Sequence, residues 1–259
     1  MGVRRMTVGD LDVEVHPDES AMGAAAARRA AKVIQAAITA RGAARVVIAT
    51  GNSQYAFTDA LVLQEVDWSA VTVFHMDEYV GVSDDHPASF QRWIRERIAD
   101  RVHPARVSYI SGEGDPEAEA ARYEAELREA PLDLVCMGIG ENGHLAFNEP
   151  GDADFDDQRW VRVIELTAAS QRQQVGEGHF PSLDSVPTRA ISLTIPALLS
   201  AKQVQVCVPE ERKADAVVAT LTGPIDPSCP ASILQRTAHA RLFLDAESSR
   251  GVADLIGVG

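Results

Sequence analysis

Cysteine is scarce in this chain of 259 residues, and the few cysteines present do not form a disulfide framework. There are three, Cys136, Cys207 and Cys229, and an odd number cannot all pair within one chain. Two of them lie inside apolar runs, which is typical of inert, buried thiols. The pattern therefore predicts free cysteines in a reducing compartment and argues against a disulfide-stabilised secreted protein.

Basic residues are also few: 24 Lys and Arg stand against 38 Asp and Glu, which gives a formal net charge of −14. A protein that binds nucleic-acid phosphates needs a basic face, so we expect no nucleic-acid partner. No apolar run approaches the roughly 18 residues of a membrane-spanning helix, and the N-terminal stretch lacks the apolar core of a signal peptide. These absences predict a cytoplasmic location and no membrane partner.

The sequence also lacks the patterns of three common kinds of functional site. The histidines are scattered and the cysteines lack ligand spacing, so no metal framework is evident. No G-x-S-x-G segment is present, which weakens an ordinary serine-hydrolase interpretation. The glycine pair Gly138 and Gly140 lacks the later glycine of the dinucleotide fingerprint, so NAD binding is not expected.

Short apolar runs rich in β-branched residues alternate with helical patterns almost throughout the chain. The predicted strands are 44–50, 71–76, 132–138, 160–166, 190–195, 203–209 and 240–246. Helices are predicted at 24–38, 55–63 and 87–98, after Glu210 and after Glu247, and 112–119 is predicted to be a loop. This alternation implies parallel strands with crossover helices, and continuous apolar strands imply cover on both faces. Because no repeat or linker divides the chain, residues 1–259 are predicted to form one α/β domain with a parallel-rich sheet.

In an open parallel sheet, ligands bind beyond the carboxyl ends of the strands. The first predicted strand is followed by a turn of small polar residues, Thr50, Gly51, Asn52, Ser53 and Gln54. Such a turn before a helix exposes backbone N–H groups, which bind anions and most commonly phosphate. An ordinary turn with Ser53 as the helix N-cap is an equally good interpretation of this segment alone.

The next two strand ends carry groups that can move protons. Asp77 directly follows the strand at 71–76, where partial burial would raise its pKa toward neutrality. A solvated loop carboxylate is the alternative. His144 and Glu149 follow the strand at 132–138 in a glycine-rich segment, and a nearby carboxylate can orient and tune a histidine. The alternative for His144 is a structural role.

Two further positions are ambiguous. Lys213 is predicted in the first turn of the helix after Glu210, where its charge opposes the helix dipole. That misfit suggests a bound anion, although a simple surface lysine explains it as well. Arg172 and His179 lie in a polar stretch that we consider as a cover for the site, but by themselves they resemble surface residues.

The segments FHMDEYVG, DDHPASF and GIGENGHLAFNEP and the turn at 50–54 resemble those of glucosamine-6-phosphate deaminases in order and spacing. The resemblance runs from about residue 24 to about residue 246 and includes SLDSVPTRAISLTI and ERKADAV. The sister 6-phosphogluconolactonases share the fold and the Gly-His turn but usually continue with a Ser-Leu-Phe-Pro type segment. The resemblance implies a Rossmann-like fold and conversion of glucosamine 6-phosphate and water to fructose 6-phosphate and ammonia. It also implies that neither a metal nor an organic cofactor is needed.

The resemblance implies roles for individual residues. Asp77 matches the base that moves a proton between carbons 2 and 1, and His144 matches the histidine that helps to open the sugar ring. Glu149 matches the carboxylate paired with that histidine, and Asn142 falls where many members carry Asp. Lys213 matches a lysine that contacts the phosphate. The other predicted substrate-binding residues are Thr50, Gly51, Asn52, Ser53, Gln54, Gly143 and Arg172.

The phosphate loop departs from the family pattern, which is often Thr-Gly-Gly or Thr-Gly-Ser followed by Thr-Pro. The family's phosphate-binding arginine has no clear counterpart: Arg172 can match a different arginine, with His179 in the phosphate position. These departures leave three alternative functions open: a galactosamine-6-phosphate deaminase, a lactone hydrolase and a non-catalytic sugar-phosphate sensor. The sequence also leaves open whether the protein forms a homo-oligomer. No allosteric Arg or Lys matches around 159–165, so we predict no activation by N-acetylglucosamine 6-phosphate.

Overall fold

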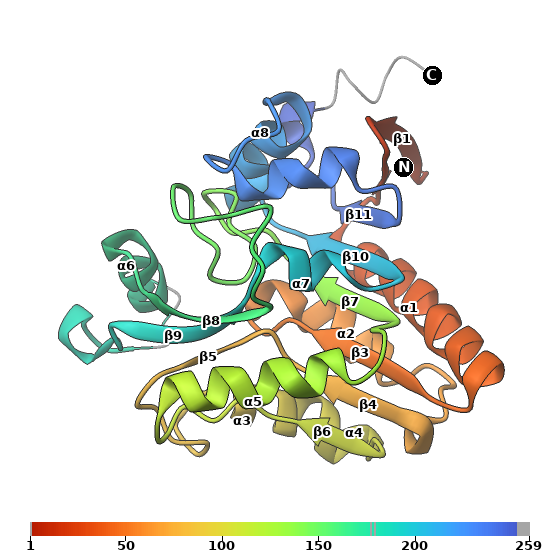
Figure 1. Ribbon diagram of the computed structural model, residues 1–259. Coiled ribbons are helices and arrows are strands. Elements are labelled where there is room, and N and C mark those ends of the chain that lie inside the picture. Colours follow the sequence, from red (N-terminus) through yellow and green to blue (C-terminus); the bar gives the residue numbers. More distant parts are fainter. Residues whose placement is uncertain (1, 177, 179, 253–259) are drawn as a thin grey trace.

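The computed structural model describes residues 2–176, 178 and 180–252. Its strands form an eight-stranded sheet in the order β1-β2-β11-β10-β7-β3-β4-β6 and a three-stranded sheet in the order β5-β9-β8 (Figure 1). The large sheet consists of β1 (Arg4–Val8), β2 (Leu11–Val15), β3 (Ala44–Ile48), β4 (Val71–Phe74), β6 (Arg106–Ser108), β7 (Leu134–Met137), β10 (Gln203–Val208) and β11 (Ala240–Leu244). The small sheet consists of β5 (Asp77–Tyr79), β8 (Val161–Glu165) and β9 (Arg189–Leu193). Neighbouring strands of the large sheet are parallel except β1 and β2, which confirms the predicted parallel-rich sheet.

Helices cover both faces of the large sheet, as predicted. They are α1 (Glu19–Arg41), α2 (Tyr55–Leu61), α3 (Phe90–Ile94), α4 (Asp100–Val102), α5 (Pro116–Arg128), α6 (Ala168–Gly176), α7 (Ile195–Leu199) and α8 (Ala214–Thr222). Helices α1, α2 and α3 pack on one buried apolar cluster, and α5, α7 and α8 pack on another (Figure 1). Helix α1 is longer than predicted because Asp18 accepts a hydrogen bond from the N–H of Ala21 at its start and Gly42, at φ 78°, ends it.

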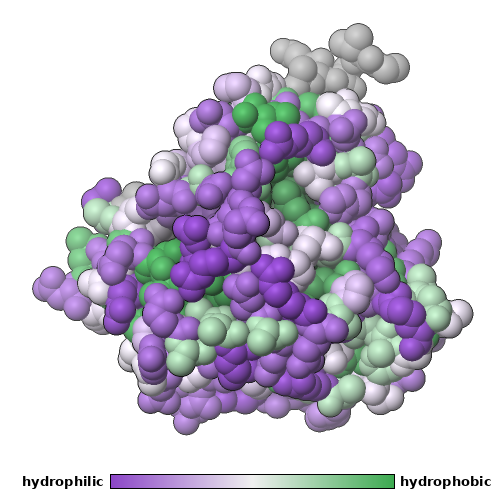
Figure 2. Space-filling view, in the orientation of Figure 1, coloured by the Kyte–Doolittle hydropathy of each residue, from purple (hydrophilic) through white to green (hydrophobic). Residues whose placement is uncertain are grey.

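Hydrophilic side chains cover most of the face seen in Figure 2, with apolar side chains in small patches between them. Within the described residues, no helix has both the length and the apolar character that crossing a membrane requires. The long helix α1 is buried along an alanine-rich stripe that faces the sheet and carries charged residues elsewhere.

Two of the predicted strands do not join the large sheet. The runs at 160–166 and 190–195 correspond to β8 and β9, which pair antiparallel with each other, and β9 also pairs antiparallel with β5. The parallel pairing expected from the alternation is therefore wrong for these two strands, although the sheet as a whole is parallel-rich as predicted. Alternation of strand and helix predicted the pairing, but it carries no information on which sheet a strand enters.

The predicted strand at 71–76 ends two residues early, and a strand of the small sheet begins directly after it. Strand β4 ends at Phe74, and β5 begins at Asp77. At the break, the carbonyl of Met76 accepts a hydrogen bond from the N–H of Leu193 in β9, so the chain passes from the large sheet into the small one. Both β4 and β5 are largely buried, although β5 begins with two acidic residues, Asp77 and Glu78.

Two helices begin at other residues than predicted, and in both a side chain caps the first turn. The segment 112–119 is not all loop, because α5 begins at Pro116 behind Asp115, whose carboxylate accepts hydrogen bonds from N–H groups of the first turn. The helix predicted at 87–98 begins only after Ser89, which caps α3. Of the helix predicted after Glu247, the described residues show one short turn at Arg250–Val252, and 253–259 lie outside them.

Candidate active site

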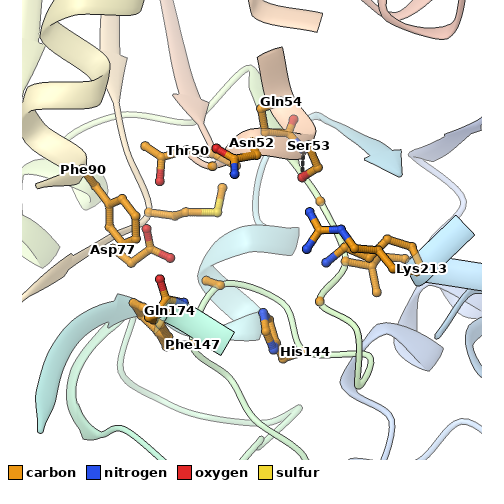
Figure 3. Close-up of a pocket in the computed structure, with 18 residues that line it drawn as sticks. Thr50, Asn52, Ser53, Gln54, Asp77, Phe90, His144, Phe147, Gln174 and Lys213 are labelled. Carbon is orange, nitrogen blue, oxygen red and sulfur yellow. Dashed lines mark hydrogen bonds between the residues drawn. The ribbon is translucent and has the colours of Figure 1, made fainter. Parts of the chain in front are cut away.

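A pocket at the carboxyl ends of β3, β7 and β10 brings together residues that are far apart in the sequence (Figure 3). Its lining comes from the turn after β3, the start of β5, the loop after β7, helix α6 and the turn after β10. The predicted site residues in that lining are Thr50, Gly51, Asn52, Ser53, Gln54, Asp77, His144 and Lys213. The pocket thus lies where ligands bind in open parallel sheets.

The turn after β3 forms one end of the pocket. Gly51 has φ 104°, a backbone conformation that glycine adopts without steric strain. Ser53 does not cap the helix, because α2 begins behind Gln54 and has no side-chain cap. The buried amide of Gln54 donates hydrogen bonds to Oγ of Ser53 at 3.4 Å and to the carbonyl of Cys207 in β10 at 3.3 Å. The N-cap alternative is therefore wrong, and Gln54 ties this turn to the neighbouring strand end.

Lys213 borders the same end of the pocket, and only 4% of this residue is exposed. It ends the turn Glu211–Lys213, which follows Glu210, a non-glycine residue at φ 78°. The N–H of Glu210 donates a hydrogen bond to Oδ2 of Asp245 at 3.2 Å, which supports this unusual backbone conformation. A largely buried ammonium group beside a turn of small polar residues suits an anionic ligand.

Asp77 lies across the pocket from Lys213 (Figure 3) and is 7% exposed. Its Oδ1 atom is buried and receives no hydrogen bond from the described residues. Burial, with repulsion from the adjacent Glu78, raises the pKa of Asp77 to about 8. Glu78 is buried too, but it has donors, namely the N–H groups of Tyr79, Phe90 and Gln91 and the hydroxyl of Ser89. Glu78 therefore anchors the start of α3, whereas Asp77 presents a carboxyl group that titrates near neutrality.

A second acid–base pair consists of His144 and Glu149. Nδ1 of His144 lies 3.1 Å from Oε1 of Glu149, without the alignment of a good hydrogen bond. Ser170 donates to the same oxygen at 2.5 Å, and the amide of Asn142 donates to Oε2 at 2.7 Å. Burial alone would raise the pKa of Glu149, but the nearby imidazole of His144 and the hydrogen bonds from Ser170 and Asn142 outweigh it and lower the pKa to about 2. Glu149 is thus a permanent carboxylate that orients the imidazole.

Two glycines explain the shape of the loop that carries His144. A Cβ atom on Gly140 would lie 2.2 Å from the imidazole ring, so only glycine lets the ring reach the pocket. Gly143 has φ 86° and turns the chain, but it does not line the pocket. The structure therefore does not place Gly143 against the pocket, contrary to its predicted part in substrate binding. A Cβ atom on Gly143 would lie 2.8 Å from Sγ of Cys229.

Some predicted residues lie outside the pocket lining. Arg172 is exposed on α6, and Asn142 donates a hydrogen bond to Glu149 and accepts one from the N–H of His144. His179 lies outside the described residues. Conversely, the sequence interpretation missed Gln174, Ser170, Arg212, Phe90 and Phe147, of which all but Ser170 line the pocket. The four-residue spacing of Ser170 and Gln174 puts both on one helix face and was the available signal. Among the described residues, no group of three or more His, Cys, Asp or Glu is placed to hold a metal ion.

Comparison with known proteins places this chain in a family. The family model of glucosamine-6-phosphate isomerases and 6-phosphogluconolactonases matches residues 17–243. The chain belongs to this family. It is 38% identical over 209 residues to a glucosamine-6-phosphate deaminase of Exiguobacterium sibiricum, covering 80% of this chain and 81% of that one. It is 34% identical over 226 residues to a glucosamine-6-phosphate deaminase of Listeria innocua, covering 87% and 94%. The resemblance identified in the sequence is confirmed.

Solved structures of the glucosamine-6-phosphate isomerase and 6-phosphogluconolactonase family have the same fold. A monomeric glucosamine-6-phosphate deaminase superposes with a TM-score of 0.85 at 28% identity, over 92% of this chain and 99% of that one. A 6-phosphogluconolactonase from Shewanella baltica superposes with a TM-score of 0.75 at 22% identity, over 95% and 100%. The lactonase likeness shows the shared fold, whereas the sequence relatives are deaminases.

Ser170→Ala tests the electrostatics around Glu149. The substitution removes a donor from a buried carboxylate, so we expect a loss of about 1–3 kcal/mol in the free energy of unfolding at pH 7. Glu149 has a lowered pKa in the folded state, so its stabilisation is present above the ordinary pKa and is lost as the pH falls toward 2. The difference between the variant and the wild type should therefore shrink at pH 3, as measured by urea unfolding.

Ser200→Ala is the matched control for this prediction. Its hydroxyl donates to the carbonyl of Ala197 in α7, and Ser200 does not line the pocket. Its effect should be small and the same at both pH values. Equal, pH-independent effects of the two substitutions would show that Ser170 does not stabilise the ionised Glu149.

Proposed function

We propose that this protein is a glucosamine-6-phosphate deaminase, which converts glucosamine 6-phosphate and water to fructose 6-phosphate and ammonia. The observation that carries the proposal is the placement of two separate acid–base groups, Asp77 and the His144–Glu149 pair, around one pocket with a phosphate-type turn. Membership in the family and the deaminase relatives support the same reaction.

The anchor for the substrate is the end of the pocket between the turn at 50–54 and Lys213. Backbone N–H groups and a buried ammonium are suited to the phosphate dianion. Binding energy from this remote group orients the sugar ring against the acid–base groups, so the phosphate contributes to turnover as well as to affinity.

The chemistry divides between the two acid–base groups. His144, oriented by Glu149, exchanges a proton with the ring oxygen and opens the pyranose to the aldehyde. Asp77, as a carboxylate, takes the proton from carbon 2 and returns it to carbon 1. This transfer converts the amine on carbon 2 to an imine. Water then adds to the imine at carbon 2, and ammonia leaves. The raised pKa of Asp77 makes it a stronger base than an ordinary carboxylate.

Ammonia release from 6-phosphorylated amino sugars tests the proposal. Purified protein is incubated with glucosamine 6-phosphate or galactosamine 6-phosphate, and ammonia is measured with a coupled dehydrogenase. We expect ammonia from glucosamine 6-phosphate at a rate well above that of the other epimer. Preference for galactosamine 6-phosphate would keep the reaction and change the substrate.

Two other outcomes would replace the proposal. Hydrolysis of 6-phosphogluconolactone without ammonia release would select the activity that the lactonase relatives are named for. Phosphosugar binding with neither reaction would select a sensor. A cytoplasmic location and a homo-oligomer stay predictions from the sequence.

A further inference from the structure

Removal of the proton from carbon 2 places negative charge on the O1 atom of the sugar, and neither Asp77 nor His144 has been assigned to stabilise that charge. The C2–H bond breaks, its proton goes to Asp77, and its electron pair forms a C1=C2 double bond. The π-electron pair of the open-chain aldehyde then moves onto its oxygen, O1. A site that speeds this step needs a hydrogen-bond donor already aimed at O1, because charge develops there only in the transition state.

Gln174 is a polar side chain of α6 placed beside Asp77. It lines the pocket although the residue is only 7% exposed, and Figure 3 shows its carboxamide pointing toward Asp77. The neighbouring wall is apolar, formed by Phe90 and Phe147. Lys213 lies on the opposite side of the pocket from Gln174 and Asp77. Gln174 therefore faces the reacting end of a sugar whose phosphate is held by Lys213.

The orientation of this carboxamide is fixed by Tyr79. The Tyr79 hydroxyl donates a hydrogen bond to Oε1 of Gln174 at 2.5 Å. Tyr79 is itself fully buried and packed against the rings of Phe90, Phe147 and Phe180. With Oε1 engaged by a donor, Nε2 is the end left to face a ligand, and it donates no hydrogen bond to the described residues.

We propose that Gln174 is a catalytic residue whose Nε2–H group donates a hydrogen bond to O1 of the open-chain sugar and stabilises the negative charge that forms there. The inference rests on the proposed deaminase reaction. A neutral amide suits this role because it gives a donor without a charge that would hold the base Asp77 in an ion pair. Tyr79 is the positioning residue that keeps Nε2, rather than Oε1, directed into the pocket.

Gln174→Ala and Gln174→Glu test the proposal with glucosamine 6-phosphate. Both should lower kcat by about 30-fold or more while KM changes less than threefold, because the bond is made chiefly in the transition state. Gln174→Glu should be the weaker enzyme, since an acceptor then faces a developing anion. Tyr79→Phe should lower kcat by a smaller factor. Gln171→Ala is the matched control, because Gln171 lies on the same helix but does not line the pocket.

A kinetic isotope effect separates this role from a structural one. With deuterium at carbon 2, the isotope effect on kcat should rise in Gln174→Ala because proton removal becomes slower than the other steps. Binding of the reduced, acyclic glucosaminitol 6-phosphate should change less than threefold, because it has no carbonyl oxygen. A kcat within twofold of the wild type, or an unchanged isotope effect with weaker binding of the acyclic compound, would overturn the inference alone. No ammonia from the wild type would overturn the proposed function and this inference with it.

Discussion

Asp77→Asn should strongly lower turnover and stabilise the fold at the same time. An amide cannot take the proton from carbon 2, and loss of a general base costs roughly 10²–10⁴-fold in rate. Because Asn and Asp have nearly the same shape, phosphosugar binding should change little. We expect kcat for ammonia release to fall by about 10³-fold, with KM or the Kd of glucosaminitol 6-phosphate within about threefold of the wild type.

The stability gain follows from the raised pKa of Asp77, which is about 8 in the folded protein and 3.8 ordinarily. Between these values the folded state holds a proton that the unfolded state has released, so the stability contribution of Asp77 falls as the pH rises from 4 to 8. Above that window the full penalty of burying the charge applies, on the order of a few kcal/mol. Asn carries no such penalty. In thermal unfolding, the Tm of the variant should therefore be higher than that of the wild type at pH 8 and nearly equal to it at pH 4.

The pH dependence of activity gives an independent check on Asp77. The group must be ionised to act as the base, so kcat/KM of the wild type should rise as the pH increases toward about 8. Asp10→Asn, in the exposed turn between β1 and β2, is the control and should alter neither rate nor stability. Unchanged turnover in Asp77→Asn would remove this residue from the mechanism.

Lys213→Ala should give the second largest effect, and it should appear mainly in binding. The substitution removes a largely buried ammonium from the phosphate end of the pocket. A hydrogen bond between charged groups contributes about 1.5–3 kcal/mol, which corresponds to a rise in KM of roughly 10- to 150-fold. Some fall in kcat is also expected, because the phosphate helps to orient the sugar.

Lys32→Ala is the control for the phosphate prediction, since Lys32 is exposed on α1. It should leave KM unchanged. Competition by inorganic phosphate provides a second measurement, because its inhibition should weaken in Lys213→Ala and persist in Lys32→Ala. A fall in kcat with unchanged KM and unchanged phosphate inhibition would place Lys213 outside the phosphate site.

The sequence predicted the residues at strand ends well because local patterns specify them. The short apolar runs before Thr50, Gly138 and Pro209 marked the ends of β3, β7 and β10, and parallel pairing brings those ends together. The position of Asp77 in the fold differs from the predicted one. It begins a strand of the small sheet rather than following one of the large sheet, but the change of sheet leaves it at the same edge.

The contributions of α6 could not be predicted because they depend on packing between distant segments. Ser170 and Gln174 are ordinary polar residues in a weakly patterned helix, and their partners Glu149 and Tyr79 lie 21 and 95 residues away along the chain. Arg172, which the family resemblance singled out, is exposed on the same helix. Charge marks residues that are able to bind an anion, but only the helix orientation decides which ones face the pocket.

The small sheet gives the two ends of the pocket separate supports. Asp77 lies on β5, and Gln174 lies on the connection between β8 and β9, so in the proposed reaction the groups that act at carbons 1 and 2 belong to the small sheet, whereas His144 follows β7 of the large sheet. The turn at 50–54 and Lys213, which form the proposed phosphate end, follow strands of the large sheet. Substitutions in the small sheet and in α6 are therefore free to alter which bond is rearranged while affinity for the phosphate group persists. A fold divided in this way can serve different reactions on sugars that share one anionic anchor.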